Sequence, residues 1–161
     1  MNILGFGNWP LRKAERIRLR GSERIFVCNK ALLKGRHLLV GITRVRNESL
    51  ILRDTLDYVG AQVDAIVAYD DASTDDTLDI LQSHPKVAMV IGNSVWESDT
   101  VARLSAETRH RGLLLQVSRS KLNFEWALCF DADERVIGDL RGFIRCAPSN
   151  QCNGVRIRLF D

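Results

Sequence analysis

Short apolar runs alternate with segments of helical periodicity from residue 38 onward. The runs predict strands over residues 38–43, 64–69, 86–91, 124–130 and 154–160. Apolar residues at helical spacing predict helices over about 48–60, after residues 73–74, over 99–118 and near 139–146. Strands that alternate with helices are typical of βαβ units. The pattern therefore predicts an α/β fold of three layers, with a mainly parallel sheet and helices on both faces.

Three of the predicted strands run into polar clusters, which read RVRNE (44–48), DDAS (70–73) and DADE (131–134). The carboxyl ends of parallel strands share one edge of a sheet. Ligands bind at that edge, where the strand order reverses. We therefore expect the three clusters to meet in space and to form a binding site.

The DADE cluster offers two carboxylates at a suggestive spacing. In an extended chain, residues two apart point to the same side, so Asp131 and Asp133 can face one cleft while Ala132 turns away. Paired carboxylates favour a hard divalent cation such as Mg²⁺ or Mn²⁺. Such a cation can hold a diphosphate and take up charge as the diphosphate leaves.

The other clusters allow both structural and ligand-binding interpretations. Asn47 can cap the helix that follows it, and Glu48 suits a helix N-terminus, but neither role excludes ligand contact. Asp71 is a candidate acceptor for a hydrogen bond from a nucleotide base. Arg109 and Arg111 precede an apolar helical stretch, where arginines commonly face solvent; the alternative is that one of them reaches the acidic edge.

Composition narrows the class of protein. The 161 residues suggest one domain, and a net charge of +3 is too small to indicate nucleic-acid binding. The four cysteines contain no CxxC pair, so we expect neither a zinc site nor a disulfide framework, and a reducing, cytoplasmic location. No apolar run reaches the roughly 18 residues that a membrane span needs.

Residues 1–36 differ in character from the rest of the chain. An apolar, glycine-containing start precedes a basic stretch, in which six Lys or Arg and two Glu lie between Arg12 and Arg24. This segment is predicted to be a solvated basic arm or a short helix. A peripheral contact with an anionic membrane through an amphipathic helix is the second interpretation.

The order and spacing of these motifs resemble a family 2 glycosyltransferase with the GT-A fold, over about residues 38–160. The stretches that carry the resemblance are LLVGITRVRNES, AIVAYDDASTDDTLDIL, AETRHRGLLL and WALCFDADERV. The resemblance implies a GT-A-like, Rossmann-like nucleotide-sugar-binding domain over residues 37–161. It also implies a divalent metal, Mn²⁺ or Mg²⁺, held by Asp131 and Asp133 together with the sugar-nucleotide diphosphate.

Matching positions imply further contacts. Asp71 would meet the base, the loop from Thr43 to Glu48 would pack on the nucleotide, and Arg109 or Arg111 would lie near the base or phosphates. The full set of implied nucleotide-sugar-binding residues is Thr43, Arg44, Asn47, Glu48, Asp70, Asp71, Arg109, Arg111 and Asp131.

The resemblance implies an inverting, metal-dependent transfer of sugar to a glycan, lipid or protein acceptor. Family members continue past the D-x-D element with an acceptor-binding region and a carboxylate general base. Glu134 and Asp161 are the late acids that the pattern puts near the edge. The alternative is a non-catalytic nucleotide-sugar-binding or scaffold protein with a truncated transferase fold.

Three other classes fit less well. A haloacid-dehalogenase phosphatase needs Thr or Val at the fifth position of its motif, where this chain has Arg135. A response-regulator receiver needs a lysine near its last strand, and no lysine follows Lys121. A nucleotidyltransferase needs a glycine-rich, basic phosphate loop after the first strand, which is missing here.

Overall fold

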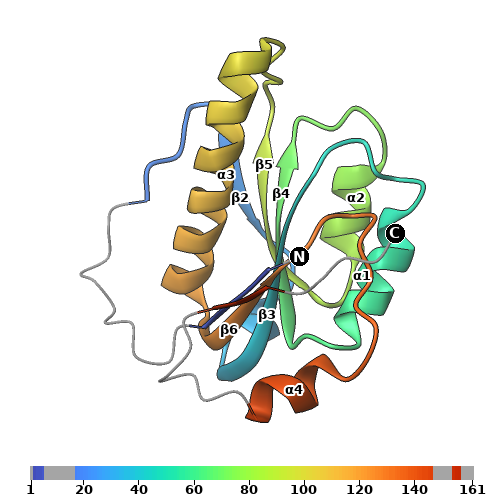
Figure 1. Cartoon of the computed structure of the whole chain (residues 1–161). Coiled ribbons are helices and arrows are strands. Elements are labelled where there is room, and N and C mark those ends of the chain that lie inside the picture. The colour runs from blue at the N-terminus through green and yellow to red at the C-terminus, as the bar shows by residue number, and fades with distance from the viewer. Residues whose placement is uncertain (1, 6–16, 147–153, 157–161) are drawn as a thin grey trace.

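The computed structural model describes residues 2–5, 17–146 and 154–156 (Figure 1). The strands are β1 (Asn2–Gly5), β2 (Glu23–Val27), β3 (Arg36–Val45), β4 (Ala65–Asp71), β5 (Val87–Asn93), β6 (Asn123–Cys129) and β7 (Gly154–Arg156). The helices are α1 (Leu52–Gly60), α2 (Thr77–Ser83), α3 (Thr100–Lys121) and α4 (Leu140–Cys146), with a 3-10 helix over Lys30–Leu33.

The strands form one sheet in the order β2-β5-β4-β3-β6-β1-β7. The four central strands, β5, β4, β3 and β6, run parallel, and the outer strands pair antiparallel. The chain moves outward from β3 through β4 to β5, then returns to place β6 on the other side of β3. The strand order therefore reverses between β3 and β6, and the predicted mainly parallel sheet is confirmed.

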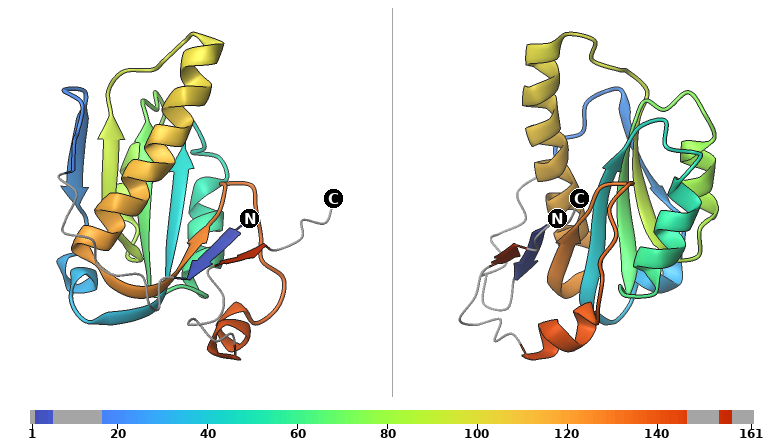
Figure 2. Two further views of the ribbon diagram at one scale, coloured as in Figure 1. Left: turned by 60° about the vertical axis from the view of Figure 1, so that its left-hand side comes forward. Right: turned by 45° about the vertical axis from the view of Figure 1, so that its right-hand side comes forward.

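Helices cover both faces of the sheet, as predicted. Helices α1 and α2 pack on one face, and α3 crosses the other (Figures 1 and 2). Leu52 and Leu56 of α1 belong to the apolar cluster on the first face. Leu114 and Val117 of α3 belong to a separate cluster on the second face. The sheet is thus the middle of three layers, and both of its faces are buried.

Strand β4 lies at the centre, and all of its residues are buried. Its side chains alternate between the faces: Ala68 packs in the α1/α2 cluster and Tyr69 in the α3 cluster. The two acids that end the strand follow the same alternation. Asp70 leaves toward α1 and α2, and Asp71 leaves toward α3.

The sequence analysis predicted no strand before residue 36, and β1 and β2 depart from that expectation. Strand β2 pairs antiparallel with β5 along Glu23 to Val27. Its first residue is a glutamate that is only 4% exposed. A charged residue buried by a partner distant in sequence leaves no local signal of a strand.

Among the described residues, no helix is both long and apolar enough to cross a membrane.

The predicted helices are present, but two of them begin later than expected. Helix α1 begins at Leu52, because Asn47 has a left-handed backbone (φ 55°) and the chain turns over residues 48–51 before the helix starts. The prediction that Asn47 caps this helix is therefore wrong. Helix α2 begins at Thr77, whose amide donates to the carboxylate of Asp75.

Candidate functional site

The reversal of strand order brings three loops to one rim of the sheet. The loop after β3 lies beside the loop after β4, since Val45 and Asp70 are register partners. The segment after β6 lies on the other side of β3, where the amide of Phe130 donates to the carbonyl of Ile42. All three sequence clusters therefore end at the same edge, but they divide between the two faces of the sheet.

Asp71 lies on the α3 face and is almost fully buried, with 2% exposure. Its carboxylate accepts a hydrogen bond from Arg44 Nη2 at 2.5 Å and another from Asn93 Nδ2 at 3.2 Å. His110 Nδ1 lies 3.8 Å from the carboxylate. These partners compensate the burial of the charge, which would otherwise be costly.

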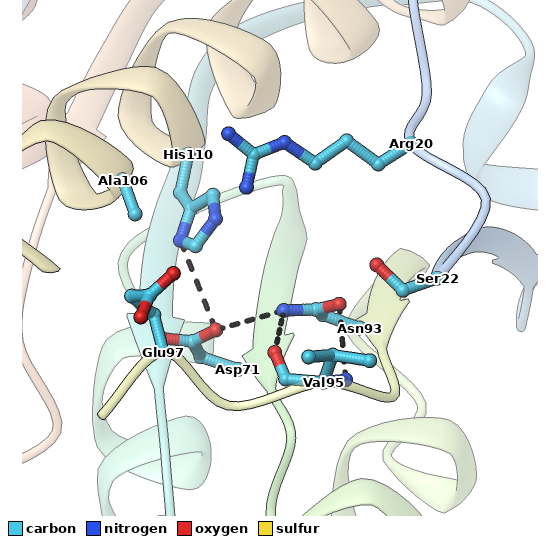
Figure 3. Close-up of a pocket in the computed structure, with 8 residues that line it drawn as sticks. All are labelled: Arg20, Ser22, Asp71, Asn93, Val95, Glu97, Ala106 and His110. Atoms are coloured by element: carbon cyan, nitrogen blue, oxygen red, sulfur yellow. Dashed lines mark hydrogen bonds and ion pairs between the residues drawn. The ribbon is translucent and has the colours of Figure 1, made fainter. Parts of the chain in front are cut away.

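A small pocket opens beside Asp71 (Figure 3). The empty space beside Asp71 is about 310 Å³, a volume that includes open solvent. In Figure 3 the side chain of Arg20 extends from the segment before β2 toward His110. The lining residues are Arg20, Ser22, Asp71, Asn93, Val95, Glu97, Ala106 and His110.

His110 is buried in the wall of this pocket. Its ring stacks on Tyr69, with centroids 4.2 Å apart and planes 20° apart. Its Nδ1 is buried and has no hydrogen-bond partner among the described residues. Burial lowers the pKa of His110, and Arg44 adds to that effect while Asp71 opposes it. A neutral imidazole at the pocket can therefore donate a hydrogen bond to a ligand or accept one from it, according to its tautomer.

Arg109 has a structural role, because it pairs with a buried acid of β2. Its guanidinium forms a two-pronged pair with the buried carboxylate of Glu23, with Nη2 to Oε2 at 2.7 Å, and the hydroxyl of Tyr69 donates to the same carboxylate. Burial alone would raise the pKa of Glu23, but hydrogen bonds from Arg109, the Arg20 amide and Tyr69 lower it to about 2. Arg109 thus ties α3 to β2.

Arg111 lies on the rim, as the acidic-edge interpretation expects. Its Nη2 lies 3.4 Å from Asp131 Oδ1 and 3.1 Å from Glu107 Oε1. The side chains of Arg111 and Asp131 are each about half exposed, at 49% and 51%. Asp131 therefore has an arginine of α3 as a charged partner at the rim.

The DADE segment is a turn, and the expectation of an extended chain there is wrong. The amide of Glu134 donates to the carbonyl of Asp131 at 3.1 Å, and the Glu134 carboxylate accepts from the Asp131 amide at 2.9 Å. Helix α1 fixes this turn, because the hydroxyl of Thr55 donates to the buried carbonyl of Ala132. The exposed Asp133 projects from a turn that is held at both ends.

The turn meets only part of the requirement for a metal site. Within residues 2–5, 17–146 and 154–156, no three His, Cys, Asp or Glu side chains converge as a ligand set. Mg²⁺ is commonly held by one or two carboxylates, with water and substrate phosphates as its other ligands. In the described structure Asp131 pairs with Arg111 of α3, and Asp133 is exposed. Asp161 lies outside the described residues.

The remaining predicted residues lie on the α1/α2 face. Asn47 joins two loops: its side-chain oxygen accepts from the Thr74 amide at 2.8 Å. Glu48 is half-buried, and its pKa is raised by burial and by the charges of Asp133 and Asp75. Thr43 and Asp70 are buried, and each has one oxygen without a hydrogen-bond partner in the described part of the chain.

The sequence patterns do not single out His110 or Trp96, and they include Arg46 only as part of the loop from Thr43 to Glu48. His110 falls between Ala106 and Leu113 on the buried stripe of α3, so a polar residue on an apolar helical face was the available signal. Arg46 and Trp96 follow different strands, and the guanidinium carbon of Arg46 lies 3.9 Å above the centre of the Trp96 ring. No sequence pattern links these two positions.

Comparison with known proteins gives little beyond the fold. No family model matches the sequence, and no curated protein matches it. A solved structure with a similar backbone is the mannosyltransferase PcManGT from Pyrobaculum calidifontis in complex with GDP-Man and Mn²⁺, with 20% sequence identity and a TM-score of 0.41. The match covers 66% of this chain and 30% of that protein. At this level the likeness assigns no activity to the chain.

Proposed function

We propose that this chain binds a nucleotide-diphosphate sugar at the rim and serves in glycosyl transfer to an acceptor hydroxyl. The observation that carries the proposal is the buried carboxylate of Asp71, which is fixed by Arg44 and Asn93 in the wall of a pocket at the carboxyl ends of β4 and β5. In open parallel sheets, ligands bind outside the carboxyl ends of the strands.

The pocket supplies what a nucleotide base requires. Asp71 accepts hydrogen bonds, Asn93 both donates and accepts, and the unpartnered nitrogen of His110 can do either, according to its tautomer. Because Arg44 and Asn93 already orient the Asp71 carboxylate, binding a base would require little reorganisation.

The diphosphate would lie across β3 toward the turn at Asp131. Asp131 and Asp133 would hold Mn²⁺ or Mg²⁺, and the bound cation would take up negative charge on the departing diphosphate. Arg111 touches Asp131 and can hold that carboxylate in place at the rim. Thr43, Asn47, Glu48 and Asp70 would shape the floor and edge of the donor site rather than contact the base.

A second candidate function is nucleotide-sugar binding without transfer. Transfer with inversion needs a base for the acceptor hydroxyl, and Glu134 is the described late acid nearest to the rim. Its carboxylate already accepts a hydrogen bond from the Asp131 amide. This hydrogen bond favours a positioning role for Glu134. These residues do not specify whether the acceptor is a glycan, a lipid or a protein.

Calorimetric titration with UDP-, GDP-, CMP- and dTDP-sugars, with and without Mn²⁺, tests the proposal. Asp71→Asn should weaken binding by about tenfold or more through loss of a charged acceptor, while the Mn²⁺ dependence remains. Asp133→Asn should instead reduce the Mn²⁺-dependent part of the affinity. Asp79→Asn, an exposed position on α2, is the matched control and should bind like the wild-type protein.

Failure of all four donors to bind folded wild-type protein at millimolar concentration with Mn²⁺ would contradict the proposal. Equal affinities for Asp71→Asn and Asp79→Asn would contradict the assignment of the base pocket. Donor binding without release of sugar to any tested acceptor would support the binding-only candidate.

A further inference from the structure

Arg46 differs from the other arginines at the rim. Its guanidinium lies 3.9 Å above the ring of Trp96, and its Nε is buried without a hydrogen-bond partner among the described residues. A guanidinium carries five N–H donors and remains charged at all ordinary pH values. A buried donor that lacks a partner is costly, so its persistence calls for an explanation.

Four other arginines near the rim are already paired with acids. Arg44 binds Asp71, Arg109 binds Glu23, Arg111 binds Glu107 and Asp131, and Arg135 binds Asp54. No carboxylate of the described residues forms such a pair with Arg46, although Glu48 lies two positions along the chain. The rim therefore carries a fixed cation whose charge is available to a ligand.

Stacking on Trp96 gives this cation a defined orientation. The contact with the ring leaves the Arg46 Nη groups without a carboxylate partner among the described residues, and a guanidinium can donate to two oxygens of a phosphate group. Trp96 lies between Val95 and Glu97, which both line the Asp71 pocket. The Arg46–Trp96 contact therefore involves the same segment after β5 that lines the pocket proposed for the base.

We infer that Arg46, held on the Trp96 ring, binds a phosphate of the nucleotide diphosphate directly. The chain's own cation then recognises the diphosphate in addition to any divalent ion at Asp131 and Asp133. This inference rests on the proposed function for the identity of the ligand. It also makes a separate claim, that a diphosphate binds in the absence of metal.

Inorganic pyrophosphate in excess EDTA is the probe, and isothermal titration is the measurement. Wild-type protein should bind it, and Arg46→Gln should weaken binding by about tenfold to a hundredfold, as expected for loss of charge-assisted hydrogen bonds. Arg46→Lys keeps the charge but loses the two-pronged edge, so its affinity should fall between the two. Arg145→Gln, on α4 at the far end of the molecule in Figure 1, is the control and should bind like the wild type.

A measurement on the unmodified chain covers the case in which the variants fold poorly. The Arg46 Nε–H resonance should shift on titration of wild-type protein with pyrophosphate, while that of Arg145 should not. No pyrophosphate binding by folded wild-type protein, no shift at Arg46, or equal affinities for wild type and Arg46→Gln would each overturn the inference.

The two proposals fail separately. Nucleotide sugars that bind equally to wild type and Arg46→Gln would leave the proposed function in place and remove Arg46 from it. Pyrophosphate binding that depends on Arg46, with no binding of any nucleotide sugar, would keep the phosphate contact and end the glycosyl-donor assignment.

Discussion

The two faces of the sheet treat acidic residues at the rim in opposite ways. On the α3 face, each buried carboxylate meets a guanidinium: Asp71 pairs with Arg44, and Glu23 pairs with Arg109. On the α1/α2 face, burial raises the pKa of Asp70 although hydrogen bonds from Ser73 oppose it, and no guanidinium among the described residues pairs with Asp70 or Glu48. Burial and neighbouring acids, Asp133 and Asp75 for Glu48, raise the pKa of that carboxyl group.

The two faces therefore differ in charge balance: the buried acids of the α3 face pair with guanidinium groups, whereas Glu48 on the α1/α2 face lies near other acids. The buried carboxylates of the α3 face are neutralised without a ligand, so they are held ready for a neutral, hydrogen-bonding partner such as a base. The α1/α2 face retains repulsion between Glu48, Asp75 and Asp133. A cation near Asp133 would relieve that repulsion, which agrees with the proposed order of base on one side and metal on the other.

Removing the guanidinium that pairs with Glu23 should have the largest effect on the free energy of unfolding. Arg109→Gln leaves the Glu23 carboxylate buried without its main partner, so the free energy of unfolding should fall by about 3 kcal/mol. Arg111→Gln is the matched control on the same helix, because it removes a half-exposed pair and should cost under about 1 kcal/mol. Urea denaturation of both variants is the measurement, and equal losses would contradict the contrast.

Low pH should remove the stabilising effect of the same Glu23–Arg109 pair. The pKa of Glu23 is about 2 in the folded protein against an ordinary value of 4.5, so its contribution to stability is present above pH 4.5 and is lost as the pH falls toward 2. The stability gap between wild type and Arg109→Gln should therefore narrow over that range. Denaturation curves collected from pH 7 down to pH 3 check this, and a constant gap would rule it out.

Loosening the DADE turn should have an intermediate effect. Thr55→Val keeps the side chain's shape but removes the hydroxyl that donates to the Ala132 carbonyl and accepts from Arg135. The free energy of unfolding should fall by about 1–2 kcal/mol. The Mn²⁺-dependent part of nucleotide-sugar affinity should fall as well, while pyrophosphate binding in EDTA should not. Unchanged Mn²⁺ dependence would show that Thr55 serves only stability.

Removing charge from the repulsive face should have the smallest effect, and of opposite sign. Glu48→Gln should raise the free energy of unfolding at pH 7 by less than about 1 kcal/mol, because the folded state no longer holds a carboxylate whose pKa is raised. The gain should appear as the pH rises through the carboxyl range and vanish below about pH 4. Thermal melts at pH 4 and pH 7 test it, and a loss at pH 7 would disprove the repulsion.

The layers of the fold could be predicted from sequence because both faces of the parallel strands are buried. Runs such as AIVAY in β4 are apolar on consecutive positions and leave a clear signal. Strand β2 left none, since its buried glutamate becomes compatible with the core only through Arg109, 86 residues later. The start of α1 was also missed, because the left-handed Asn47 is fixed by contacts with the loop after β4.

The position of the candidate site at the rim could be predicted from the sequence, but the pairs that its side chains form could not. Parallel topology alone puts the acids of all three clusters at one edge. Strand alternation separates Asp70 from Asp71, yet nothing local indicates that Arg44 binds Asp71 while Arg46 stacks on Trp96. These choices depend on the path of the segment between β5 and α3. They emerge only when the tertiary structure brings that segment over the rim.

The bonds between the two loops on the α1/α2 face have a consequence for local opening. The amides of Asn47, Glu48 and Ser49 donate to side chains of the loop after β4, and the Thr74 amide donates back to Asn47. Neither loop can lift without breaking the bonds of the other. In amide hydrogen exchange, the two loops should therefore open as one cooperative unit, although about 25 residues of sequence, including α1 and β4, lie between them.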